Sequence, residues 1–373
     1  MKKQGILFFA DRLPPLIGGM EMHAKYFIDY FTDHLEFPIV GIITKDLNLE
    51  DYLISKKGND SIDIKNLAEL FDPMIIFFNS GRWIEELDQL RMMFPKTKFV
   101  YRTGGNEILQ APLAHNKILD HSLRQSYWVK SLNNSINLLI TNSVYTEDRL
   151  RALGITCLFK RLVGGVNLSK LKLSTVYTNS KPLTIFCAAR FVPYKNHTFM
   201  LSVIHKLALR GYDFKLRLAG DGPLLCQARE QVNKANLSSV VEFLGVLDNN
   251  KTCNEIASAN IYMQLSTDQI TKVPGGSYIH SEGMGRSILE AITAGTFIVA
   301  GNSGALSEII TRDRGLLVNI DNLEQTTNQI ELILRNPPAK LACDDQYSWT
   351  NLFKSYEELF ENFHEDIAGH RKI

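Results

Sequence analysis

Two basic residues in the second half of the chain are spaced to bind a diphosphate. Arg190 follows an apolar run, Pro193 comes next, and Lys195 stands where a helical pattern begins. An arginine offers a bidentate fork and a lysine a compact charge, a combination that suits two neighbouring phosphates. Two solvated surface cations would explain the same residues, so the pair alone leaves both interpretations open.

Two carboxylates lie in the glycine-rich segment from Ser281 to Gly295. Glu282 is in a loop and Glu290 is one turn into the following helix, so both can point into the same end of a sheet. A carboxylate accepts two hydroxyl hydrogen bonds at once, which is what a ribose or a hexose presents. Two alternatives stay open: Ser287 and Glu290 fit a capping box, and the two carboxylates could be the acid and nucleophile of a glycosidase.

Glycines at two strand-to-helix turns could let backbone N–H groups approach a phosphate. Gly18 and Gly19 precede the first helical pattern, and Gly220 opens a Gly-Asp-Gly-Pro turn in the second half. The N–H groups at a helix N-terminus favour anions. Neither turn has the dinucleotide fingerprint G-x-G-x-x-G or a P-loop. Plain strand-to-helix turns explain these glycines as well.

The elements that must position these residues are short apolar runs that alternate with amphipathic stretches. The runs are continuously apolar, which is typical of parallel strands covered on both faces, and ligands bind beyond the carboxyl ends of such strands. We therefore predict an α/β fold with two similar domains in tandem. The predicted strands are residues 6–10, 37–44, 74–78, 98–102, 136–141, 184–189, 215–219, 240–245, 261–265, 297–300 and 315–318, and the predicted helices are 20–31, 83–94, 195–209, 223–234, 287–294, 322–334 and 349–364.

The domain boundaries follow from a segment in which the alternation of apolar runs and amphipathic stretches stops. A segment rich in Ser, Thr and Lys without an apolar run ends at Pro182 and reads as a linker. We predict an N-terminal domain over residues 1–170, a linker over 171–182, a C-terminal domain over 183–348 and a last helical segment over 349–373.

Length, composition and charge exclude several classes of protein. The 373 residues are 45% hydrophobic and 22% charged, an average globular mixture and not that of a disordered chain, a collagen or a coiled coil. The net charge of +1 argues against nucleic acid as a partner. Five widely spaced cysteines without a C-x-x-C motif indicate thiols, four of them expected to be buried, in a reducing cytoplasm. No apolar run is long enough to be a signal peptide or a membrane span.

The order and spacing of these motifs resemble those of the family-4 glycosyltransferases, retaining nucleotide-sugar enzymes of the GT-B fold. The resemblance covers nearly the whole chain and implies two Rossmann-like α/β/α domains that face a central cleft. The N-terminal domain would bind the acceptor, the C-terminal domain would bind the nucleotide sugar, and the last helix would cross back to the N-terminal domain. The motifs are Gly18-Gly19 with Glu21 and His23, Thr141-Asn142-Ser143, Gly164-Gly165-Val166-Asn167, Ala189-Arg190 with Lys195-Asn196, Gly220-Asp221-Gly222-Pro223, Glu282-Gly283-Met284-Gly285 with Glu290-Ala291, Gly295, and Ser303-Gly304 with Glu308.

The resemblance also implies roles for individual residues. Arg190 and Lys195 would bind the donor diphosphate and stabilise charge on the leaving nucleotide, whereas Glu282 would hold the hydroxyls of the donor sugar. Glu290 would bind the ribose. The backbone positions expected to contact the donor are Gly18, Gly19, Gly220, Met284 and Gly285. Related enzymes use no metal and the chain has no D-x-D motif. We therefore expect no metal and no cofactor, with a UDP- or GDP-linked sugar as substrate.

The acceptor side departs from the usual family pattern. Where many relatives have a histidine-containing loop, this chain has Arg102-Thr103-Gly104-Gly105-Asn106-Glu107, which resembles a subset acting on bacterial surface polysaccharides. His23, Gly105, Asn106 and Glu107 are the candidates for acceptor contacts. The segment 266–280 is longer than usual and is either a mobile lid over the donor or an inserted surface loop.

The expected activity is retaining transfer of a hexose from a nucleotide diphosphate to a glycan or lipid-linked acceptor in capsule, O-antigen or lipopolysaccharide biosynthesis. The alternatives are a catalytically silent sugar- or nucleotide-binding subunit and an NDP-sugar epimerase on the same fold. The expected location is the cytoplasm. Residues 102–172 hold ten Lys or Arg against four Asp or Glu, a net charge of +6, which would suit the inner leaflet of the membrane. The stretch 117–134 could lie at that surface or be an ordinary helix packed on the sheet.

Overall fold

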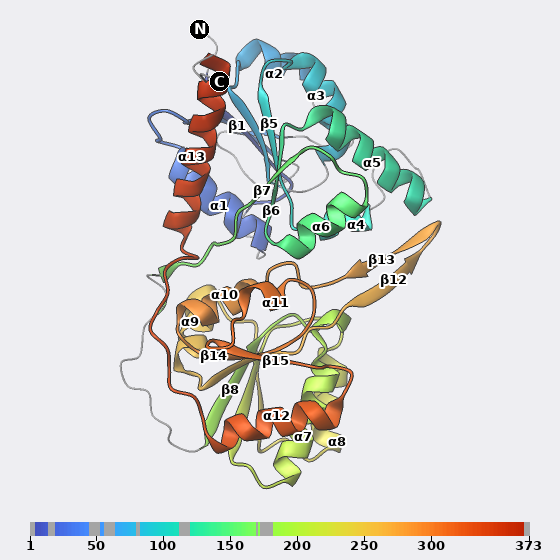
Figure 1. Cartoon of the computed structure of the whole chain (residues 1–373), viewed down its shortest axis with the longest axis vertical. Coiled ribbons are helices and arrows are strands. Elements are labelled where there is room, and N and C mark those ends of the chain that lie inside the picture. The colour runs from blue at the N-terminus through green and yellow to red at the C-terminus, as the bar shows by residue number, and fades with distance from the viewer. Residues whose placement is uncertain are drawn as a thin grey trace. The chain divides into compact units, whose positions relative to one another are not determined.

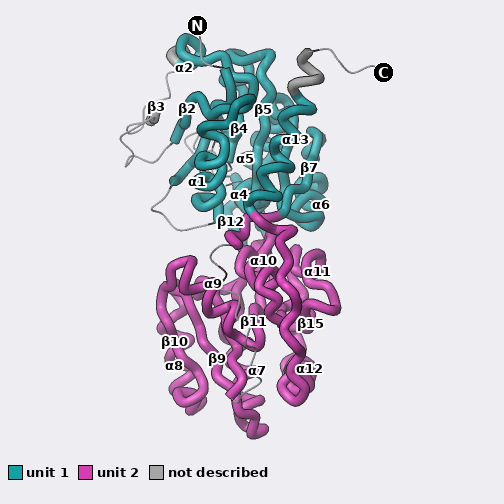
Figure 2. The backbone as a smooth tube through the Cα atoms, turned by 90° about the vertical axis from the view of Figure 1, so that its left-hand side faces the viewer, with its two compact units in different colours: residues 1–163, 271–278, 349–373 teal, residues 164–270, 279–348 magenta. Residues whose placement is uncertain are grey.

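The computed structural model describes residues 4–13, 19–44, 53–55, 64–79, 83–111, 120–168, 171 and 182–368. They belong to two compact units (Figure 2). Unit 1 comprises residues 1–163, 271–278 and 349–373, and unit 2 comprises residues 164–270 and 279–348. Residues 172–181 of the predicted linker lie outside the described residues.

Unit 1 is built on a seven-stranded sheet with the order β3-β2-β1-β4-β5-β6-β7, and every neighbouring pair is parallel (Figure 1). The strands are β1 (Ile6–Ala10), β2 (Ile39–Thr44), β3 (Leu53–Ser55), β4 (Ile75–Asn79), β5 (Lys98–Arg102), β6 (Leu138–Thr141) and β7 (Leu158–Arg161). The helices are α1 (Gly19–Phe31), α2 (Ile64–Leu70), the 3-10 turn η1 (Trp83–Glu86), α3 (Leu87–Met93), α4 (Asn106–Gln110), α5 (His121–Ser135), α6 (Val144–Ala152) and α13 (Trp349–Ala368).

Helices cover both faces of the unit 1 sheet, which explains why its central strands are continuously apolar. Successive residues of β1 point to opposite faces. Leu7 and Phe9 join a core that includes side chains of α3 and α5, whereas Ile6 and Phe8 join a second core that includes α1 and α13. The last helix therefore completes one face of unit 1.

Unit 2 repeats this design with a six-stranded parallel sheet of order β10-β9-β8-β11-β14-β15. The strands are β8 (Leu183–Ala188), β9 (Phe214–Ala219), β10 (Val241–Gly245), β11 (Ile261–Gln264), β14 (Phe297–Gly301) and β15 (Gly315–Val318). The helices are the 3-10 turn η3 (Pro193–Lys195), α7 (His197–Leu209), α8 (Leu225–Lys234), α9 (Asn249–Ser258), α10 (Arg286–Thr293), α11 (Leu306–Ile309) and α12 (Leu323–Arg335). The prediction of two α/β domains with parallel sheets is confirmed.

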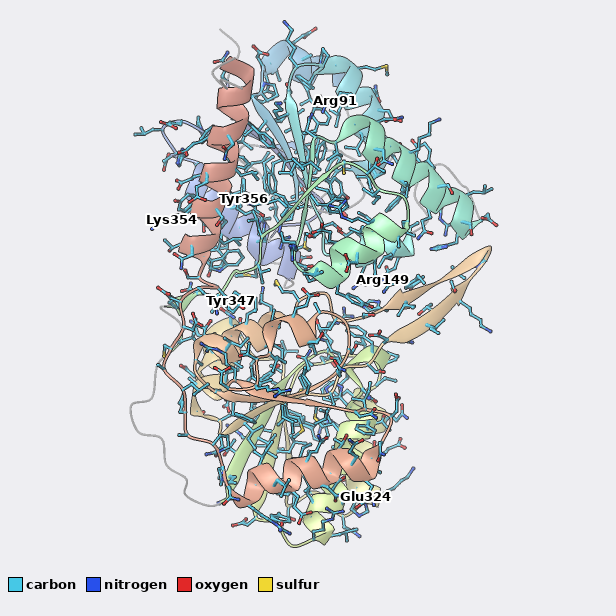
Figure 3. The ribbon with its side chains drawn as sticks, viewed as in Figure 1. Arg91, Arg149, Glu324, Tyr347, Lys354 and Tyr356 are labelled. Atoms are coloured by element: carbon cyan, nitrogen blue, oxygen red, sulfur yellow. The ribbon has the colours of Figure 1, made fainter. Side chains whose placement is uncertain are left out.

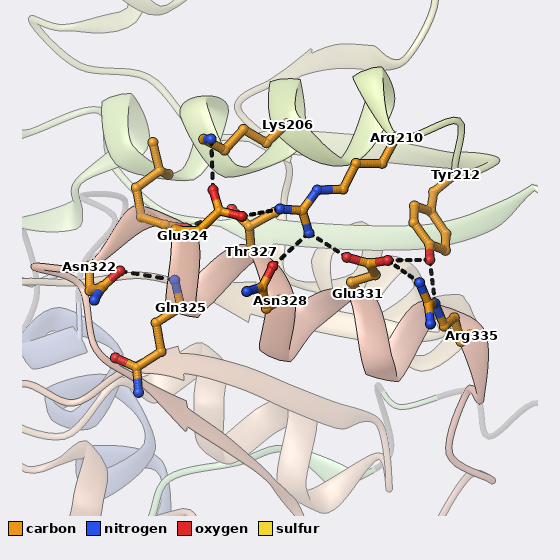
Figure 4. Close-up of polar contacts among 11 residues, drawn as sticks. Lys206, Arg210, Tyr212, Asn322, Glu324, Gln325, Thr327, Asn328, Glu331 and Arg335 are labelled. Atoms are coloured by element: carbon orange, nitrogen blue, oxygen red, sulfur yellow. Dashed lines mark hydrogen bonds and ion pairs between the residues drawn. The ribbon is translucent and has the colours of Figure 1, made fainter.

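An exposed ion network joins α7 to α12 on the surface of unit 2 (Figure 4). The guanidinium of Arg210 pairs with both Glu324 and Glu331, and Lys206 Nζ lies 2.8 Å from a Glu324 oxygen. The hydroxyl of Tyr212 donates to Glu331 at 2.7 Å. The two helices pack side by side, and this network links their exposed surfaces.

The structure adds detail to one local prediction and corrects two others. The segment 266–280, predicted as a mobile lid or an inserted surface loop, contains a hairpin of β12 (Gln269–Val273) and β13 (Gly276–His280). Its tip belongs to unit 1, where Ser122 Oγ donates to the carbonyl of Gly275 at 2.6 Å. The helix predicted from Lys195 begins at His197, because Lys195 closes a 3-10 turn and Asn196 takes a left-handed φ of 56°. Four of the five cysteines were expected to be buried, but only Cys187 and Cys253 are, since Cys226 and Cys343 are exposed and Cys157 is half-buried.

The described part of the chain contains no helix long and apolar enough to cross a membrane. In the predicted interfacial stretch, residues 117–119 are not described, and the rest lies mainly in α5. Trp128 on α5 is 1% exposed and packs in the core of unit 1, with Tyr127 and Val129 against the same core. The apolar side of this helix therefore covers the sheet.

Candidate functional site

The candidate site in unit 2 is built on the carboxyl ends of two neighbouring strands. β8 and β11 pair directly in the middle of the sheet, with Ile185 beside Ile261. The chain leaving β8 carries Arg190 and the turn with Lys195, and the chain leaving β11 leads through the hairpin to Glu282. Parallel neighbours end at the same edge, so residues about 90 positions apart meet there.

Lys195 and Glu282 form the central contact of this site. The ammonium of Lys195 pairs with Glu282 Oε2, and the two side chains are only 11% and 10% exposed. The same oxygen accepts hydrogen bonds from Gln264 Nε2 at 2.8 Å and from Ser266 Oγ at 3.3 Å. Burial is the largest single effect and would lower the pKa of Lys195, but Glu282, Tyr194 and Cys187 together outweigh it and the pKa is raised. The lysine therefore stays protonated.

Glycines hold the loops of this site close to other backbone. Gly304 has a φ of +55°, and a Cβ there would lie 2.2 Å from the carbonyl oxygen of Glu282. The same carbonyl accepts the N–H of Ala305 at 2.9 Å, which pins the loop that carries the carboxylate. At Gly220, φ is +134° and a Cβ would lie 2.1 Å from the oxygen of Ala189. Both positions therefore require glycine for packing, whatever contact Gly220 makes with a donor.

Arg190 is exposed and differs from Lys195 in having no bound carboxylate. Its guanidinium forms no hydrogen bond or ion pair with any residue in the described ranges. Its charge still acts on the site. Burial lowers the pKa of the His280 ring; Glu282 opposes this effect, and Lys195 and Arg190 add to it. Among the described residues, Arg190 is therefore a cation without a carboxylate partner, at the edge where Lys195 is already paired with Glu282.

The helix α10 begins after a glycine. Gly285 is its N-cap with a φ of 71° and forms no side-chain cap hydrogen bond. The Ser287 hydroxyl is engaged elsewhere, accepting from the hydroxyl of Tyr262 at 2.7 Å. The capping-box alternative for Ser287 and Glu290 is therefore wrong. The N–H groups beside Gly285 and the half-buried Met284 suit an anion or a sugar oxygen.

Glu290 is 5% exposed, and two side chains hold one oxygen of its carboxylate. Asn249 Nδ2 donates to Oε1 at 3.1 Å, and Arg286 Nε lies 3.8 Å from the same oxygen. Asn249 is the first residue of α9 and Arg286 the first of α10. Sequence reasoning missed both partners. Asn249 could have been found, because it follows the carboxyl end of the strand that ends at Gly245, and ligands bind beyond such strand ends.

His23 lies in the core of unit 1 rather than on its surface. It is 1% exposed, and its Nε2 lies 3.1 Å from the hydroxyl of Tyr356 on α13, which Figure 3 labels. Burial lowers the pKa of His23 well below its ordinary value, and the charge of Arg102 adds to this effect. The structure therefore uses this ring to join α1 to α13.

The remaining residues predicted on the acceptor side surround the start of α4. The Glu107 carboxylate accepts from the Thr103 hydroxyl at 2.5 Å and from the N–H of Gly104 at 3.1 Å. Gly105 is the N-cap of α4 with a φ of 89°, and Asn106 is its half-buried first residue. Glu107 thus organises the loop that follows β5.

The first glycine pair is only partly described. Gly18 lies outside the described residues, and Gly19 is the exposed first residue of α1. A Cβ on Gly19 would meet no atom within 4 Å, so its surroundings are open. The structure thus assembles Arg190, Lys195, Gly220, Glu282, Met284, Gly285 and Glu290 in unit 2, and it places Gly19, His23, Gly105, Asn106 and Glu107 in unit 1.

Residues 174–346 match the family model described as "Glycosyl transferases group 1". The chain is similar to a GDP-mannose-dependent monoacylated alpha-(1-6)-phosphatidylinositol monomannoside mannosyltransferase of Corynebacterium glutamicum, 25% identical over 66% of this chain and 63% of the relative. It is 21% identical, over 65% of this chain and 56% of the relative, to the GPI3 subunit of a Saccharomyces cerevisiae phosphatidylinositol N-acetylglucosaminyltransferase. The match thus spans about three fifths of these two relatives. A GDP-mannose-dependent mannosyltransferase of Mycolicibacterium smegmatis is 22% identical over 89% of this chain and 90% of the relative.

Solved structures share the fold over almost the whole chain. Anabaena Alr3699/HepE, solved in complex with UDP and glucose, matches with a TM-score of 0.72 over 96% of this chain and 99% of its own, at 16% identity. The lipopolysaccharide outer core galactosyltransferase WaaB in its apo form matches with a TM-score of 0.67 over 96% and 100%, at 12% identity. At such identities the likeness shows the fold alone.

Proposed function

We propose that the protein transfers a hexose from a nucleotide-diphosphate sugar to a glycan or lipid-linked acceptor, because residues 174–346 match the model of the group 1 glycosyl transferases and the two units have the GT-B fold. The observation that carries this proposal is that one sheet edge holds both the buried Lys195–Glu282 pair and Arg190, which has no partner among the described residues. Cations beside a carboxylate are what a sugar diphosphate requires, since one end is anionic and the other is a polyol.

Each group of the site has a role in this proposal. Arg190 and Lys195 bind the diphosphate, and the N–H groups at the start of α10 approach it or the sugar. Glu282 accepts from sugar hydroxyls, and Glu290 accepts from the ribose. The basic pair acts mainly where charge develops on the leaving diphosphate, because that is the largest electrostatic change in the reaction.

The proposed reaction retains the configuration of the anomeric carbon. The bond from this carbon to the diphosphate oxygen breaks, and a bond to the acceptor oxygen forms on the same face. The acceptor proton passes to the phosphate oxygen that leaves, so no protein base is needed. The bonding of Glu282 supports this path, because one of its oxygens already accepts from Lys195, Gln264 and Ser266, which weakens it as a nucleophile.

The names of the relatives suggest the class of donor and acceptor. The mannosyltransferases are named for GDP-mannose and a phosphatidylinositol monomannoside, and one structural neighbour was solved with UDP and glucose. We propose a GDP- or UDP-linked hexose as donor and a lipid-linked or glycan acceptor of a bacterial surface polysaccharide, bound by unit 1 near Gly105, Asn106 and Glu107. The reaction would take place at the cytoplasmic face of the membrane, without a metal or other cofactor.

The experiment that tests this proposal is thermal unfolding with UDP, GDP, ADP and CMP and their common sugar conjugates, followed by turnover of any conjugate that binds. A ligand at about 100 times its Kd adds roughly 2.7 kcal/mol to the free energy of unfolding. We expect stabilisation by one base, release of that nucleotide from its sugar conjugate, and the same rate in excess EDTA. Binding without turnover would favour a silent binding subunit. Absence of binding to the whole panel would contradict the proposal.

A further inference from the structure

β11 carries polar side chains at alternate positions although it lies in the middle of the unit 2 sheet. The strand pairs with β8 on one side and β14 on the other. Tyr262, Gln264 and Ser266 are each completely buried. Residues two apart on a strand share one face. A buried amide without hydrogen-bond partners destabilises the folded state, so a glutamine at this place needs a defined set of hydrogen bonds.

The hydrogen bonds of Gln264 can run in only one direction. Glu282 Oε2 accepts, so the Gln264 atom 2.8 Å away must be the Nε2 donor. The amide oxygen then accepts, and two hydroxyls can donate to it, Ser287 Oγ at 3.2 Å and the Tyr262 hydroxyl at 3.3 Å. The Tyr262 hydroxyl also lies 2.7 Å from Ser287 Oγ and 3.2 Å from the carbonyl oxygen of Ala188. Tyr262 and Ser287 therefore hold the amide oxygen of Gln264, whose amide nitrogen donates to Glu282.

A shorter branch ends on the same oxygen. The second N–H of Gln264 points to Ser266 Oγ at 3.1 Å, and the Ser266 hydroxyl donates to Glu282 Oε2 at 3.3 Å. With Lys195, three donors therefore converge on Oε2. Glu282 Oε1 forms no hydrogen bond with the residues that the structure describes. The described residues thus hold the carboxylate through Oε2 and leave Oε1 available as an acceptor.

We propose that Gln264 is a positioning residue that fixes the rotation of the Glu282 carboxylate, so that Oε2 is bound by the protein and Oε1 accepts from a hydroxyl of the donor sugar. This inference rests on the proposed function and goes beyond it by assigning a role to a side chain in the strand beneath the site. Through Ser287, Gln264 also links this carboxylate to the first turn of α10, where the diphosphate would bind.

The test exchanges Gln264 for residues of similar size that lose the donor. Gln264→Leu removes both hydrogen-bonding groups, and we expect transfer to fall roughly tenfold or more in kcat while the Kd of the nucleoside diphosphate stays within about twofold. Gln264→Glu keeps the shape and places a carboxyl group against Glu282. Like charges raise the pKa of such a pair, so the introduced group donates only when it is protonated. Its activity relative to the wild type should recover as the pH falls from 8 to 6.

The matched control is Asn260→Asp, an amide-to-acid change at the residue just before β11. Asn260 accepts from the N–H of Thr184 at 2.8 Å and is 7% exposed. The pH profile of this variant should follow that of the wild type, because a merely structural change of charge beside β11 does not touch Glu282. Wild-type turnover and pH profiles in both Gln264 variants would overturn the inference. Absence of turnover in the wild type would overturn the proposed function and this inference with it.

Discussion

The Lys195–Glu282 pair should be strongly coupled in stability. Its side chains are only 11% and 10% exposed, so water screens the two charges weakly. Charges about 4 Å apart at an effective dielectric constant of about 20 attract by about 4 kcal/mol. Lys195→Met leaves the carboxylate buried with only the neutral donors Gln264 and Ser266. Breaking a buried pair in this way typically costs about 3–5 kcal/mol.

The measurement is a double-mutant cycle of Lys195→Met, Glu282→Gln and the two combined, each followed by chemical denaturation. We expect each single change to destabilise unit 2 and the combined variant to be more stable than the sum of the two losses predicts. The coupling free energy should reach about 2 kcal/mol or more. A coupling below about 0.5 kcal/mol would refute the reasoning, because it would mean that each charge is solvated independently.

The remaining predictions concern the other charged groups of unit 2. Arg190→Ala should lower kcat by more than it raises KM, because the guanidinium acts on charge that develops on the leaving group; steady-state kinetics with unchanged kcat would contradict this role. Glu290→Ala should weaken the binding of nucleoside diphosphates by roughly tenfold in calorimetry, because the ribose hydroxyls and Asn249 both lose the carboxylate that accepts their hydrogen bonds. A loss of stability without a loss of affinity would show that Glu290 is a structural residue. His197 stacks on Phe191, and burial lowers its pKa to about 4, with Lys195 adding to the effect. Because this pKa lies below the unfolded value, stability is present above about pH 6.5 and is lost as the pH falls toward 4, by about 2 kcal/mol between pH 7 and 5. His197→Phe should flatten that part of the denaturation profile, and an unchanged slope would contradict the assignment.

The repeated strand-and-helix pattern could be predicted because it is local information. The run at 6–10 is apolar at every position and the run at 184–189 at every position except Thr184, and that pattern alone indicates strands covered on both faces. The predicted helices also agree with the observed ones to within a few residues, since amphipathic periodicity and turn residues determine them. The hairpin of β12 and β13 was missed because its residues alternate only weakly and its Pro274-Gly275 turn reads as a loop.

The burial of individual side chains was predicted less well. His23 stands in a motif at the start of a helix, and nothing in its neighbours along the chain shows that Tyr356 will cover it. Cys226 and Cys343 have apolar or helical neighbours in sequence but lie on exposed faces. Burial depends on which elements pack together, and these residues meet their partners, or solvent, only after the chain has folded.

The sequence by itself determined the α/β architecture and the types of residue that the donor site would contain, because periodicity and residue chemistry are properties of short segments. The tertiary structure alone decided how those residues act. Lys195 and Glu282 are 87 positions apart and meet because β8 and β11 are neighbours in the sheet, an order that no local pattern encodes. The same order places Gln264 under Glu282 and leaves Arg190 free. Which cation is paired with a carboxylate and which oxygen of Glu282 the protein binds therefore follow from strand order, through contacts that form only when distant segments pack.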